Sequence, residues 1–293
     1  MNNLTKRTLS GVVLCAIMVS ACLFGPLFPF VVLFCIGWTM HEFYSMAYGR
    51  SGDFIPERVL AVLTAMLLFV LVSLVMLGYL RDRAIALALI PLLALMILPI
   101  WMKDHSRHSR MASVYTGLVC IGLPMALSPL ITLRGQEHDG YLLLCLFAII
   151  WLSDVGAYAL GTALGQRPGA WKLAPAISPK KSWWGLAGAV LSGAGISVAL
   201  YFLGLFRFPL VHCIVCGMIA SAFGVLGDLV ESMFKRSFGY KDSGSLIPGH
   251  GGLYDRLDSA IVAIPAAAIY LELSGLLSSG PQGGQELHLQ GRV

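Results

Sequence analysis

The stretch Thr8–Met40, TLSGVVLCAIMVSACLFGPLFPFVVLFCIGWTM, contains no Asp, Glu, Lys or Arg and indicates which class of protein this chain is. As a single helix it would be about 50 Å long, whereas the hydrocarbon core of a bilayer is about 30 Å thick. Gly25 and two prolines lie in its middle, and proline breaks a helix because it lacks a backbone N–H donor. The stretch therefore predicts two membrane-spanning helices joined by a tight turn, over about 8–24 and 27–46.

The composition of the whole chain agrees with this interpretation. Of its 293 residues, 57% are hydrophobic and only 12% are charged, and the mean hydropathy is +0.80. Soluble domains average about 45–50% apolar and about 25% charged residues. The composition therefore excludes a soluble globular protein, and it excludes a disordered chain, which would be polar and highly charged. The predicted fold class is all-α, as a polytopic integral membrane protein.

Seven further apolar segments raise the predicted number of spans to nine. They cover about residues 57–80, 84–102, 111–133, 140–163, 183–206, 208–229 and 259–278. With the N-terminus inside, the inside segments hold fifteen Lys and Arg residues and the outside segments hold five. Because basic residues gather on the cytoplasmic side, this ratio supports nine spans with a cytoplasmic N-terminus. A signal peptide is not expected, since no soluble mature domain follows.

We expect three regions along the chain. Residues 1–139 hold about five spans, 140–278 hold the remaining spans with the cytoplasmic motif loops, and 279–293 form a disordered tail, because they are polar and Gly-rich. All seven cysteines lie in apolar stretches, and an odd number there argues against a disulfide framework. The CxxC pair Cys213 and Cys216 is interpreted as two small core residues rather than a redox or metal motif.

Two segments expected on the cytoplasmic side, residues 154–185 and 224–258, carry the polar residues that suggest chemistry. Together they hold six of the fifteen acids and eight of the twenty Lys and Arg residues. Asp154 follows the apolar run LLLCLFAIIWLS, and a charge at such a depth usually marks a functional position. The alternative is that Asp154 lies near the helix end and pairs with a neighbour. The functional surface is therefore expected on the cytoplasmic side.

Two pairs of acids lie three residues apart, so each pair shares one helix face. The pairs are Asp228 with Glu231, and Asp255 with Asp258. Two helix ends with two carboxylates each form an oxygen-rich site that suits a hard cation such as Mg²⁺. Ser232 lies on the same face as Asp228. Lys235 lies four residues after Glu231, and an ion pair between them is the simpler alternative for Glu231.

A glycine-rich basic loop, KRSFGYKDSGSLIPGHGG, separates the two acid pairs. Its glycines let backbone N–H groups approach a phosphate, and its cations are of the phosphate-binding type. Ser178–Ser182, SPKKS, adds two lysines and two hydroxyl groups, although a charged loop without function is the alternative there. These segments predict a site for a metal–polyphosphate complex. A zinc site at His250, a P-loop and a dinucleotide-binding motif are not indicated.

The second cytoplasmic segment resembles the signature of the phosphatidate cytidylyltransferases, or CDP-diacylglycerol synthases. The similar residues are Ser232-Met-Phe-Lys235-Arg236, Lys241-Asp242 and Pro248-Gly-His250-Gly251-Gly252-Leu-Tyr-Asp255-Arg256-Leu-Asp258. The stretches 227–232, 154–158 and 178–183 are also similar to this family. Position 182 is often Thr in the family, and Ser182 keeps the hydroxyl group. The resemblance covers about residues 140–275, whereas the N-terminal half matches only as a run of spans.

The resemblance implies an Mg²⁺-dependent enzyme, with a second cation left open, that transfers CMP from CTP to phosphatidic acid. The implied products are CDP-diacylglycerol and pyrophosphate. The implied partners are CTP, phosphatidic acid, the lipid bilayer and, as one option, a second copy of the chain in a homodimer, with no nucleic acid. The expected location is the inner (cytoplasmic) membrane, as a multi-pass protein whose active site faces the cytoplasm.

The residues and the resemblance together yield three groups of expected site residues. The catalytic group is Asp228, Asp255, Lys235, Arg236, Lys241, Asp242, His250 and Arg256. The metal group is Asp228, Asp255, Asp258, Asp154 and Glu231. The substrate-binding group is Ser178, Lys180, Lys181, Ser182, Ser232, Gly251 and Gly252. Asp228 and Asp255 are expected to be the principal ligands, with carboxyl groups about 4–6 Å apart.

Two other functions are compatible with parts of the sequence. A cation-coupled transporter also has intramembrane acids and Gly-broken helices, but its acids should lie near the midplane rather than gather at one face. A CTP-dependent lipid kinase would transfer the γ-phosphoryl group instead. The acids other than Asp154 gather at one face beside basic Gly-rich loops, which argues against the transporter. The long signature argues against the kinase.

Overall fold

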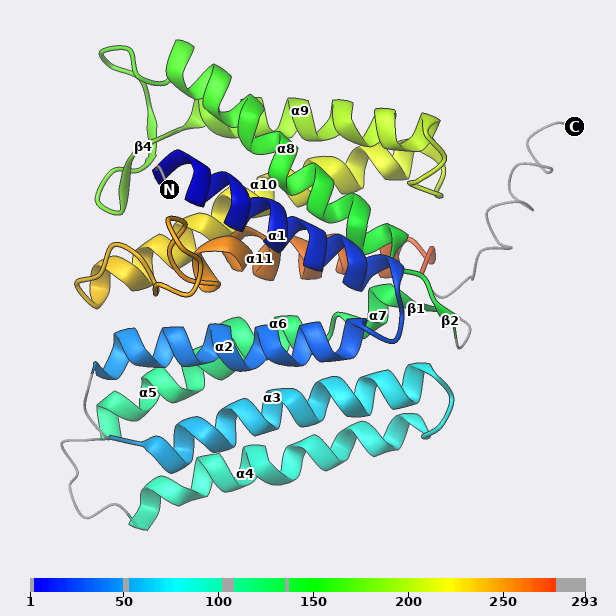
Figure 1. The fold of residues 1–293 in the computed structure, drawn as a ribbon, viewed down its shortest axis with the longest axis vertical. Helices are drawn as coiled ribbons and strands as arrows, with labels where there is room; N and C mark the ends of the chain where they lie inside the picture. The colour runs from blue at the N-terminus through cyan, green and yellow to red at the C-terminus, as the bar shows by residue number, and fades with distance from the viewer. Residues whose placement is uncertain (1–2, 50–52, 102–107, 135–136, 278–293) are drawn as a thin grey trace, which may run out of the picture. The chain divides into compact units, whose positions relative to one another are not determined.

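The computed structural model describes residues 3–49, 53–101, 108–134 and 137–277 (Figure 1). These residues are mostly α-helical with two short β-hairpins, so the predicted all-α class is confirmed. The chain divides into two compact units, neither of which is contiguous in sequence. The units are Met1–His138 with Ser237–Leu257, and Asp139–Arg236 with Asp258–Val293. The predicted three-region division stays a prediction, and its disordered tail, 279–293, lies outside the described residues.

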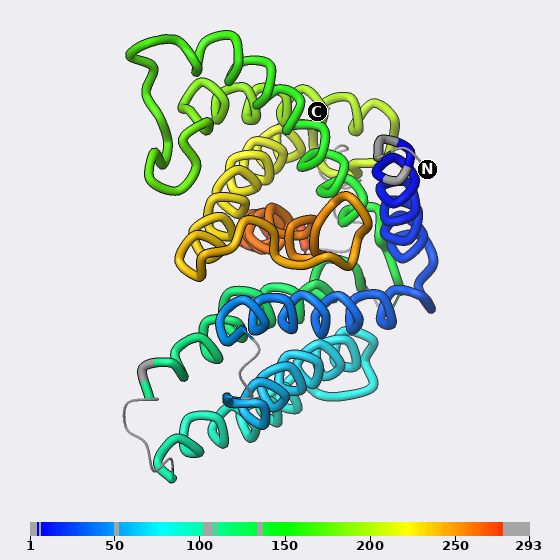
Figure 2. The backbone as a smooth tube through the Cα atoms, turned by 60° about the vertical axis from the view of Figure 1, so that its left-hand side comes forward, coloured from blue at the N-terminus to red at the C-terminus, as the bar shows by residue number. Residues whose placement is uncertain are grey.

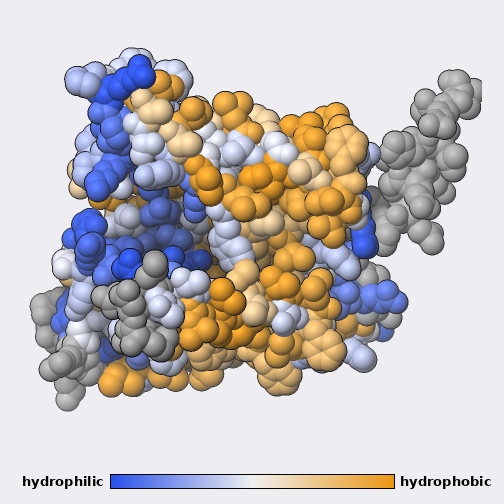
Figure 3. Space-filling view, turned by 45° about the horizontal axis from the view of Figure 1, so that its top comes forward, coloured by the Kyte–Doolittle hydropathy of each residue, from blue (hydrophilic) through white to orange (hydrophobic). Residues whose placement is uncertain are grey.

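Seven helical segments of the described chain are long and apolar enough to cross a membrane. They are Phe28–Tyr48, Ile55–Met76, Asp82–Trp101, Arg110–Thr132, Tyr141–Ala163, Trp183–Phe202 and Leu210–Ser237. The helices α1 (Asn3–Leu23) and α11 (Tyr254–Leu273) lie at the other two predicted spans. Hydrophobic residues cover much of the face in Figure 3. The helices therefore support a polytopic membrane protein, while its orientation stays a prediction.

The first unit contains the N-terminal helices. After α1, its elements are α2 (Phe28–Tyr48), α3 (Ile55–Met76), η1 (Asp82–Ala88), α4 (Leu89–Ile97), η2 (Leu98–Trp101), α5 (His108–Gly117), η4 (Leu118–Gly122), α6 (Leu123–Ala126), α7 (Pro129–Thr132), β1 (Leu133–Arg134) and β2 (Glu137–His138). Helices α2 and α3 lie side by side (Figures 1 and 2). The loop from Ser237 to the start of α11 belongs to the same unit.

The break between α1 and α2 lies where glycine and proline predicted it. Helix α1 ends at Leu23 and α2 begins at Phe28. A hydrogen bond of 3.0 Å from the Leu27 N–H to the Phe24 carbonyl oxygen closes the turn between them. A proline occupies the first turn of α2, where its missing N–H costs no intrahelical hydrogen bond. The prediction of two separate helices in Thr8–Met40 is confirmed.

Two predicted spans are not regular α-helices throughout. Residues 84–102 contain the 3₁₀ segments η1 and η2, and residues 111–133 contain the π-helical turn η4. Pro99 lies in η2, and Pro124 lies two residues after the end of η4. A proline ring collides with the carbonyl group four residues earlier, and a π-turn relieves this collision because it widens the backbone. Pro99 and Pro124 thus account for the irregular backbone at η2 and η4, whereas η1 contains no proline.

The second unit contains the C-terminal helices. Its elements are α8 (Tyr141–Ala163), β3 (Lys172–Ala174), β4 (Ser178–Ser182), α9 (Trp183–Phe202), α10 (Leu210–Ser237) and most of α11. Helices α8 and α9 pack closely, since a Cβ atom at Gly156 would lie only 2.7 Å from the Gly188 carbonyl oxygen. Gly156 therefore permits this close helix contact, as small residues do between membrane helices. The antiparallel hairpin of β3 and β4 was not predicted.

Helix α10 is longer than the span predicted for it. It has 28 residues and ends at Ser237, eight residues after the predicted end of the span. At 1.5 Å per residue, this extension is about 12 Å long. Helix α11 likewise begins at Tyr254 rather than near 259. Both acid pairs therefore lie on helices, as their spacing predicted.

Candidate active site

Three carboxylates gather in the second unit. Asp228 and Glu231 project from α10 and Asp258 projects from α11, and one oxygen atom of each lies within 4.8 Å of the others. Glu231 is only 1% exposed, whereas the other two are half-buried. Like charges at this separation repel each other strongly where water is scarce. We call these three residues the acid cluster, and it requires positive charge nearby.

Gly227 allows the two helices of the acid cluster to approach each other. A Cβ atom at this position would lie 2.6 Å from the Asp258 carbonyl oxygen and 3.0 Å from the Ser259 Cα atom. Any side chain here would push α10 and α11 apart, because such distances are shorter than van der Waals contact. The glycine that precedes Asp228 therefore helps to bring the carboxylates of the two helices together.

Two lysines offset part of the negative charge. Lys181 Nζ lies 2.7 Å from Asp228 Oδ2, and Lys235 Nζ lies 2.6 Å from Glu231 Oε2, so the ion pair considered for Glu231 is present. The Ser232 hydroxyl group donates to Asp228 Oδ1 at 3.2 Å. Three carboxylates and two ammonium groups leave one net negative charge. Hard cations prefer carboxylate oxygens, so these residues fit a divalent metal ion.

A cavity of about 610 Å³ adjoins the acid cluster at Asp228. This volume is typical of ligand sites, which measure about 300–1,000 Å³. Its charged and hydroxyl-bearing lining residues are Asp154, Tyr158, Thr162, Lys180, Lys181, Ser182 and Asp228. The structure therefore brings Asp154, the SPKKS motif and Asp228 together. Asp154 lines the cavity but is not one of the three clustered carboxylates.

The hairpin of β3 and β4 holds the two cavity lysines, which both lie on β4. Besides its ion pair, Lys181 donates from Nζ to the Val225 carbonyl oxygen on α10 at 3.2 Å. Lys172 on β3 donates to the Gly165 carbonyl oxygen at 2.7 Å and so fastens the hairpin to the end of α8. Lys180 is exposed. The hairpin thus directs one lysine to the acid cluster and leaves the other accessible.

The two serines of SPKKS differ in their surroundings. Ser182 is buried at the N-cap of α9, where its hydroxyl oxygen accepts the Gly185 N–H at 3.2 Å. An N-cap satisfies a helix donor that would otherwise have no partner, so this hydroxyl group has a structural role. Ser178 lies at the other end of β4 and is not among the residues that line the cavity. Their substrate contacts stay predictions.

A second polar centre lies in the first unit, around Glu42 on α2. Glu42 is 4% exposed, and its carboxylate accepts four hydrogen bonds. The donors are Trp38 Nε1 (2.9 Å), Ser243 Oγ (3.0 Å), Leu253 N (3.0 Å) and Tyr254 N (2.8 Å). Charge-assisted hydrogen bonds of this kind are about twice as strong as neutral ones. Glu42 therefore holds both the loop before α11 and the first residues of that helix.

The carboxylate of Asp255 belongs to this second centre. Its Oδ2 atom accepts the Ser243 N–H at 2.9 Å and the Gly252 N–H at 2.8 Å, and it lies 3.0 Å from the Ser243 hydroxyl oxygen, whose single proton it shares with Glu42. Gly251 has a φ of +83°, and a Cβ atom there would lie 2.5 Å from the same oxygen. A Cβ atom at Gly252 would collide with the side chains of Ser243 and Glu42. Gly251 and Gly252 therefore have structural reasons to be glycine, and their phosphate contacts stay predictions. Asp228 lies in the other unit, so the expected distance between it and Asp255 stays a prediction as well.

The remaining expected residues lie in or beside the loop between α10 and α11. Four of them are exposed, namely Arg236, Lys241, Asp242 and Arg256. His250 is half-buried, and desolvation together with the charges of Arg256 and Arg7 lowers its pKa below the ordinary value for histidine. Their catalytic roles stay predictions.

The roles of two residues, Ser243 and Glu42, were not predicted from the sequence. Ser243 connects Glu42 and Asp255, and nothing in its local pattern signals this role. Glu42 does carry a signal, because it is the only Asp, Glu, Lys or Arg between Arg7 and Arg50. An acid isolated in an apolar span is a functional or structural position by default.

Comparison with protein families adds an independent observation. The model of the family described as "Cytidylyltransferase family" matches residues 5–274, which is most of the chain. The match includes the helices that carry the acid cluster, the β3–β4 hairpin and Glu42.

Curated relatives match over shorter segments. A phosphatidate cytidylyltransferase from Haemophilus influenzae is 43% identical over 143 residues, which cover 45% of this chain and 48% of the relative. One from Staphylococcus haemolyticus is 40% identical over 138 residues, covering 47% and 52%. A third, from Staphylococcus saprophyticus, is 42% identical over 125 residues, covering 43% and 46%. The chain therefore spans about half the length of the curated relatives it matches.

Proposed function

This chain belongs to the cytidylyltransferase family, and we propose that it transfers CMP from CTP to phosphatidic acid, giving CDP-diacylglycerol and pyrophosphate. The observation that carries the proposal is the acid cluster beside a lysine-lined cavity, in a chain built of apolar helices. The three relatives named phosphatidate cytidylyltransferase support the same reaction. We further propose that the protein is a multi-pass protein of the inner (cytoplasmic) membrane with its active site toward the cytoplasm.

The proposed reaction requires one oxygen of the lipid phosphate to attack the α-phosphorus of CTP. A P–O bond forms there while the bond to the β-phosphate breaks, and pyrophosphate leaves. A phosphomonoester has a second pKa of about 6, so the lipid phosphate is mostly a dianion at pH 7 and needs no general base. The main obstacle is repulsion between two anions. Lys180 and Lys181 in the cavity wall supply positive charge and N–H donors that offset it.

We propose that Asp228, Glu231 and Asp258 hold a divalent cation, and that this cation is Mg²⁺. Bound Mg²⁺ supplies charge neutralisation at the reacting phosphates and at the pyrophosphate leaving group. Lys181 and Ser232 contact different oxygens of Asp228 and so fix the orientation of its carboxylate. In this scheme the carboxylates hold the metal and move no protons.

Purified protein with phosphatidic acid, Mg²⁺ and radiolabelled CTP tests the proposal. Label on the α-phosphate should appear in the lipid, and label on the γ-phosphate should appear in pyrophosphate. Lipid labelled from the γ-position would instead identify a lipid kinase. Absence of any labelled lipid from an intact, folded preparation would contradict the proposed function.

Two controls accompany this experiment. Removal of Mg²⁺ with EDTA should abolish labelling, and addition of Mg²⁺ should restore it. Replacement of CTP by ATP should give little product. Equal activity without a divalent cation would contradict the proposed role of the acid cluster.

A further inference from the structure

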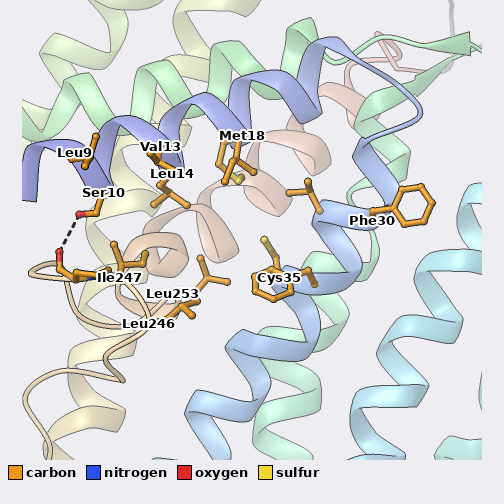
Figure 4. Close-up of a pocket in the computed structure, with 14 residues that line it drawn as sticks. Leu9, Ser10, Val13, Leu14, Met18, Phe30, Cys35, Leu246, Ile247 and Leu253 are labelled. Carbon is orange, nitrogen blue, oxygen red and sulfur yellow. Dashed lines mark hydrogen bonds between the residues drawn. The ribbon is translucent and has the colours of Figure 1, made fainter. Parts of the chain in front are cut away.

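An apolar groove in the first unit has no role in the chemistry described so far. It has a volume of about 800 Å³ and lies between α1, the first half of α2 and the loop before α11 (Figure 4). Val13 and Ile17 on α1, Phe34 on α2 and Ile247 in the loop contribute to its hydrocarbon walls. Of its fourteen lining residues, Ser10 alone carries a side-chain oxygen or nitrogen atom. The groove therefore suits a long aliphatic ligand.

The end of the groove at Ser10 is polar and cationic. The Ser10 hydroxyl group lies 3.0 Å from His250 Nδ1. Arg7 donates from Nε to the Gly249 carbonyl oxygen at 2.8 Å, and Arg256 donates from Nη2 to the His250 carbonyl oxygen at 3.0 Å. Both arginines are exposed. Two guanidinium groups and an imidazole thus meet where the hydrocarbon walls begin.

The lowered pKa of His250 supports this arrangement. Besides desolvation, the positive charges of Arg256 and Arg7 lower it, which requires both guanidinium groups to lie near the imidazole. An anion at this place would relieve the repulsion between the two guanidinium groups. Arginine forms paired hydrogen bonds with phosphate oxygens especially well.

The length of the groove matches one leaflet of a bilayer. Its α1 wall extends from Leu9 to Met18, which is about 14 Å at 1.5 Å per residue. Half of a hydrocarbon core of about 30 Å is about 15 Å. The cationic end lies at the start of the apolar part of α1, Arg7–Leu23. A chain that enters at this end would therefore run from headgroup depth through one leaflet.

We propose that the groove binds one acyl chain of phosphatidic acid, with the lipid phosphate between Arg7 and Arg256. The proposal rests on the proposed function, because it states where the lipid substrate of that reaction is held. Charge complementarity selects this occupant. A phosphomonoester carries up to two negative charges, whereas a phosphodiester lipid carries one and a zwitterionic lipid carries none in total.

Photolabelling of the full-length wild-type protein tests the groove directly. The protein is placed in phosphatidylcholine nanodiscs with phosphatidic acid that carries a diazirine in one acyl chain. After irradiation, peptides that include residues 9–18 and 246–253 should carry the label, and unlabelled phosphatidic acid should reduce it at least fivefold. Labelling elsewhere alone, or equal competition by phosphatidylglycerol, would overturn the assignment.

A matched pair of substitutions on α1 tests the same groove by kinetics. Val13 lines the groove, whereas its exposed neighbour Val12 does not. Val13→Trp should raise the KM for dioleoyl phosphatidic acid about tenfold and leave the KM for a dihexanoyl analogue within twofold. Val12→Trp should change neither value. Equal effects of the two substitutions, or equal effects on both substrates, would overturn the proposal.

The two proposals fail in different ways. If wild-type protein makes no CDP-lipid, the proposed function is wrong, whatever the photolabelling shows. If wild-type protein makes CDP-lipid but the label avoids the groove, only the groove assignment is wrong. The photolabelling needs no variant, so it remains decisive even if Val13→Trp fails to fold.

Discussion

Two aspartates with the same predicted role have very different surroundings. Asp228 contacts a lysine and a serine hydroxyl group beside a cavity, whereas Asp255 accepts two backbone N–H groups and a serine hydroxyl group. Asp258, which was expected as a further ligand, lies in the acid cluster with Asp228. Side-chain chemistry alone does not distinguish these three carboxylates, but their partners do.

Asp258→Asn provides the test of the acid cluster. The substitution keeps the size of the side chain but removes one of the charges expected to hold a divalent cation. We expect kcat/KM to fall at least 100-fold and the Mg²⁺ concentration for half-maximal activity to rise, with unchanged thermal unfolding. Asp82→Asn, in the first turn of η1, is the matched control. Wild-type Mg²⁺ dependence in Asp258→Asn would exclude this carboxylate as a ligand.

Lys181→Met provides a separate test of the cavity. It removes the ammonium group that pairs with Asp228 and donates to Val225. A lost charge-assisted hydrogen bond costs about 1.5–3 kcal/mol, so kcat/KM for CTP should fall roughly 10- to 150-fold. Lys180→Met removes an exposed charge and should have a smaller effect. The phosphate-binding role would be refuted by wild-type kinetics in both variants.

Long-range hydrogen bonds organise the elements of the first unit. Glu42 on α2 binds Ser243, Leu253 and Tyr254, which are 201, 211 and 212 residues away in sequence. Local sequence does not identify hydrogen-bond partners that are so distant, so the role of Glu42 was not predicted. The turn after α1 was predictable because the effect of proline on a helix is local. The acid pairs were predictable because a spacing of three residues defines a helix face.

Glu42→Gln should destabilise the first unit. The amide keeps one acceptor oxygen, but its NH₂ group replaces the other. The N–H and O–H groups that donated to that second oxygen then have no acceptor. A buried group without a hydrogen-bond partner costs about 1–3 kcal/mol, so the free energy of unfolding should fall by about that amount. Thermal unfolding in detergent measures this loss, with exposed Glu272→Gln as the control. Equal unfolding temperatures for the two variants would contradict the structural role of Glu42.

Helix α9 offers two glycines with opposite expectations. A Cβ atom at Gly188 would come within 3.0 Å of the Gly156 carbonyl carbon, whereas one at Gly195 would meet nothing within 4 Å. Gly188→Ala should therefore lower stability by about 1–3 kcal/mol, because overpacking forces the helices apart. Gly195→Ala should raise it by up to about 1 kcal/mol, because alanine favours a helix. A stabilising Gly188→Ala would argue against close packing of α8 and α9.

For the whole molecule, the charge pattern predicts how the chain is oriented in the membrane. Nine spans with a cytoplasmic N-terminus require Ser178, on β4, to face the cytoplasm and Tyr79, after α3, to face the opposite side. Single cysteines at these positions, in a background without the seven native cysteines, should react with an impermeant maleimide from opposite sides. Tyr79 is 75% exposed and so should be accessible to the reagent. Labelling of both positions from one side would refute the nine-span topology.

Composition and local pattern thus predicted the helices. The contacts between segments that are distant in sequence could be seen only in the structure. The approximate limits of most of these helices followed from apolar length, which depends on neighbouring residues only. The π-turn before Pro124 and the β3–β4 hairpin depend on backbone geometry that hydropathy does not encode. The cavity combines residues from α8, β4, α9 and α10, so only the three-dimensional arrangement shows it.

The extra eight residues of α10 change the solvation problem for the proposed reaction. A triphosphate would lose much of its hydration if it had to enter hydrocarbon, and a lipid would expose both tails if it had to enter water. Glu231 lies two residues, about 3 Å, beyond the predicted end of the span, and α10 continues to Ser237, so Glu231 would lie at the depth of lipid phosphates. The triphosphate could then remain in water while the lipid substrate remains in the bilayer. The products would also separate by partition, since CDP-diacylglycerol stays in the bilayer while pyrophosphate diffuses away, and this separation disfavours the reverse reaction.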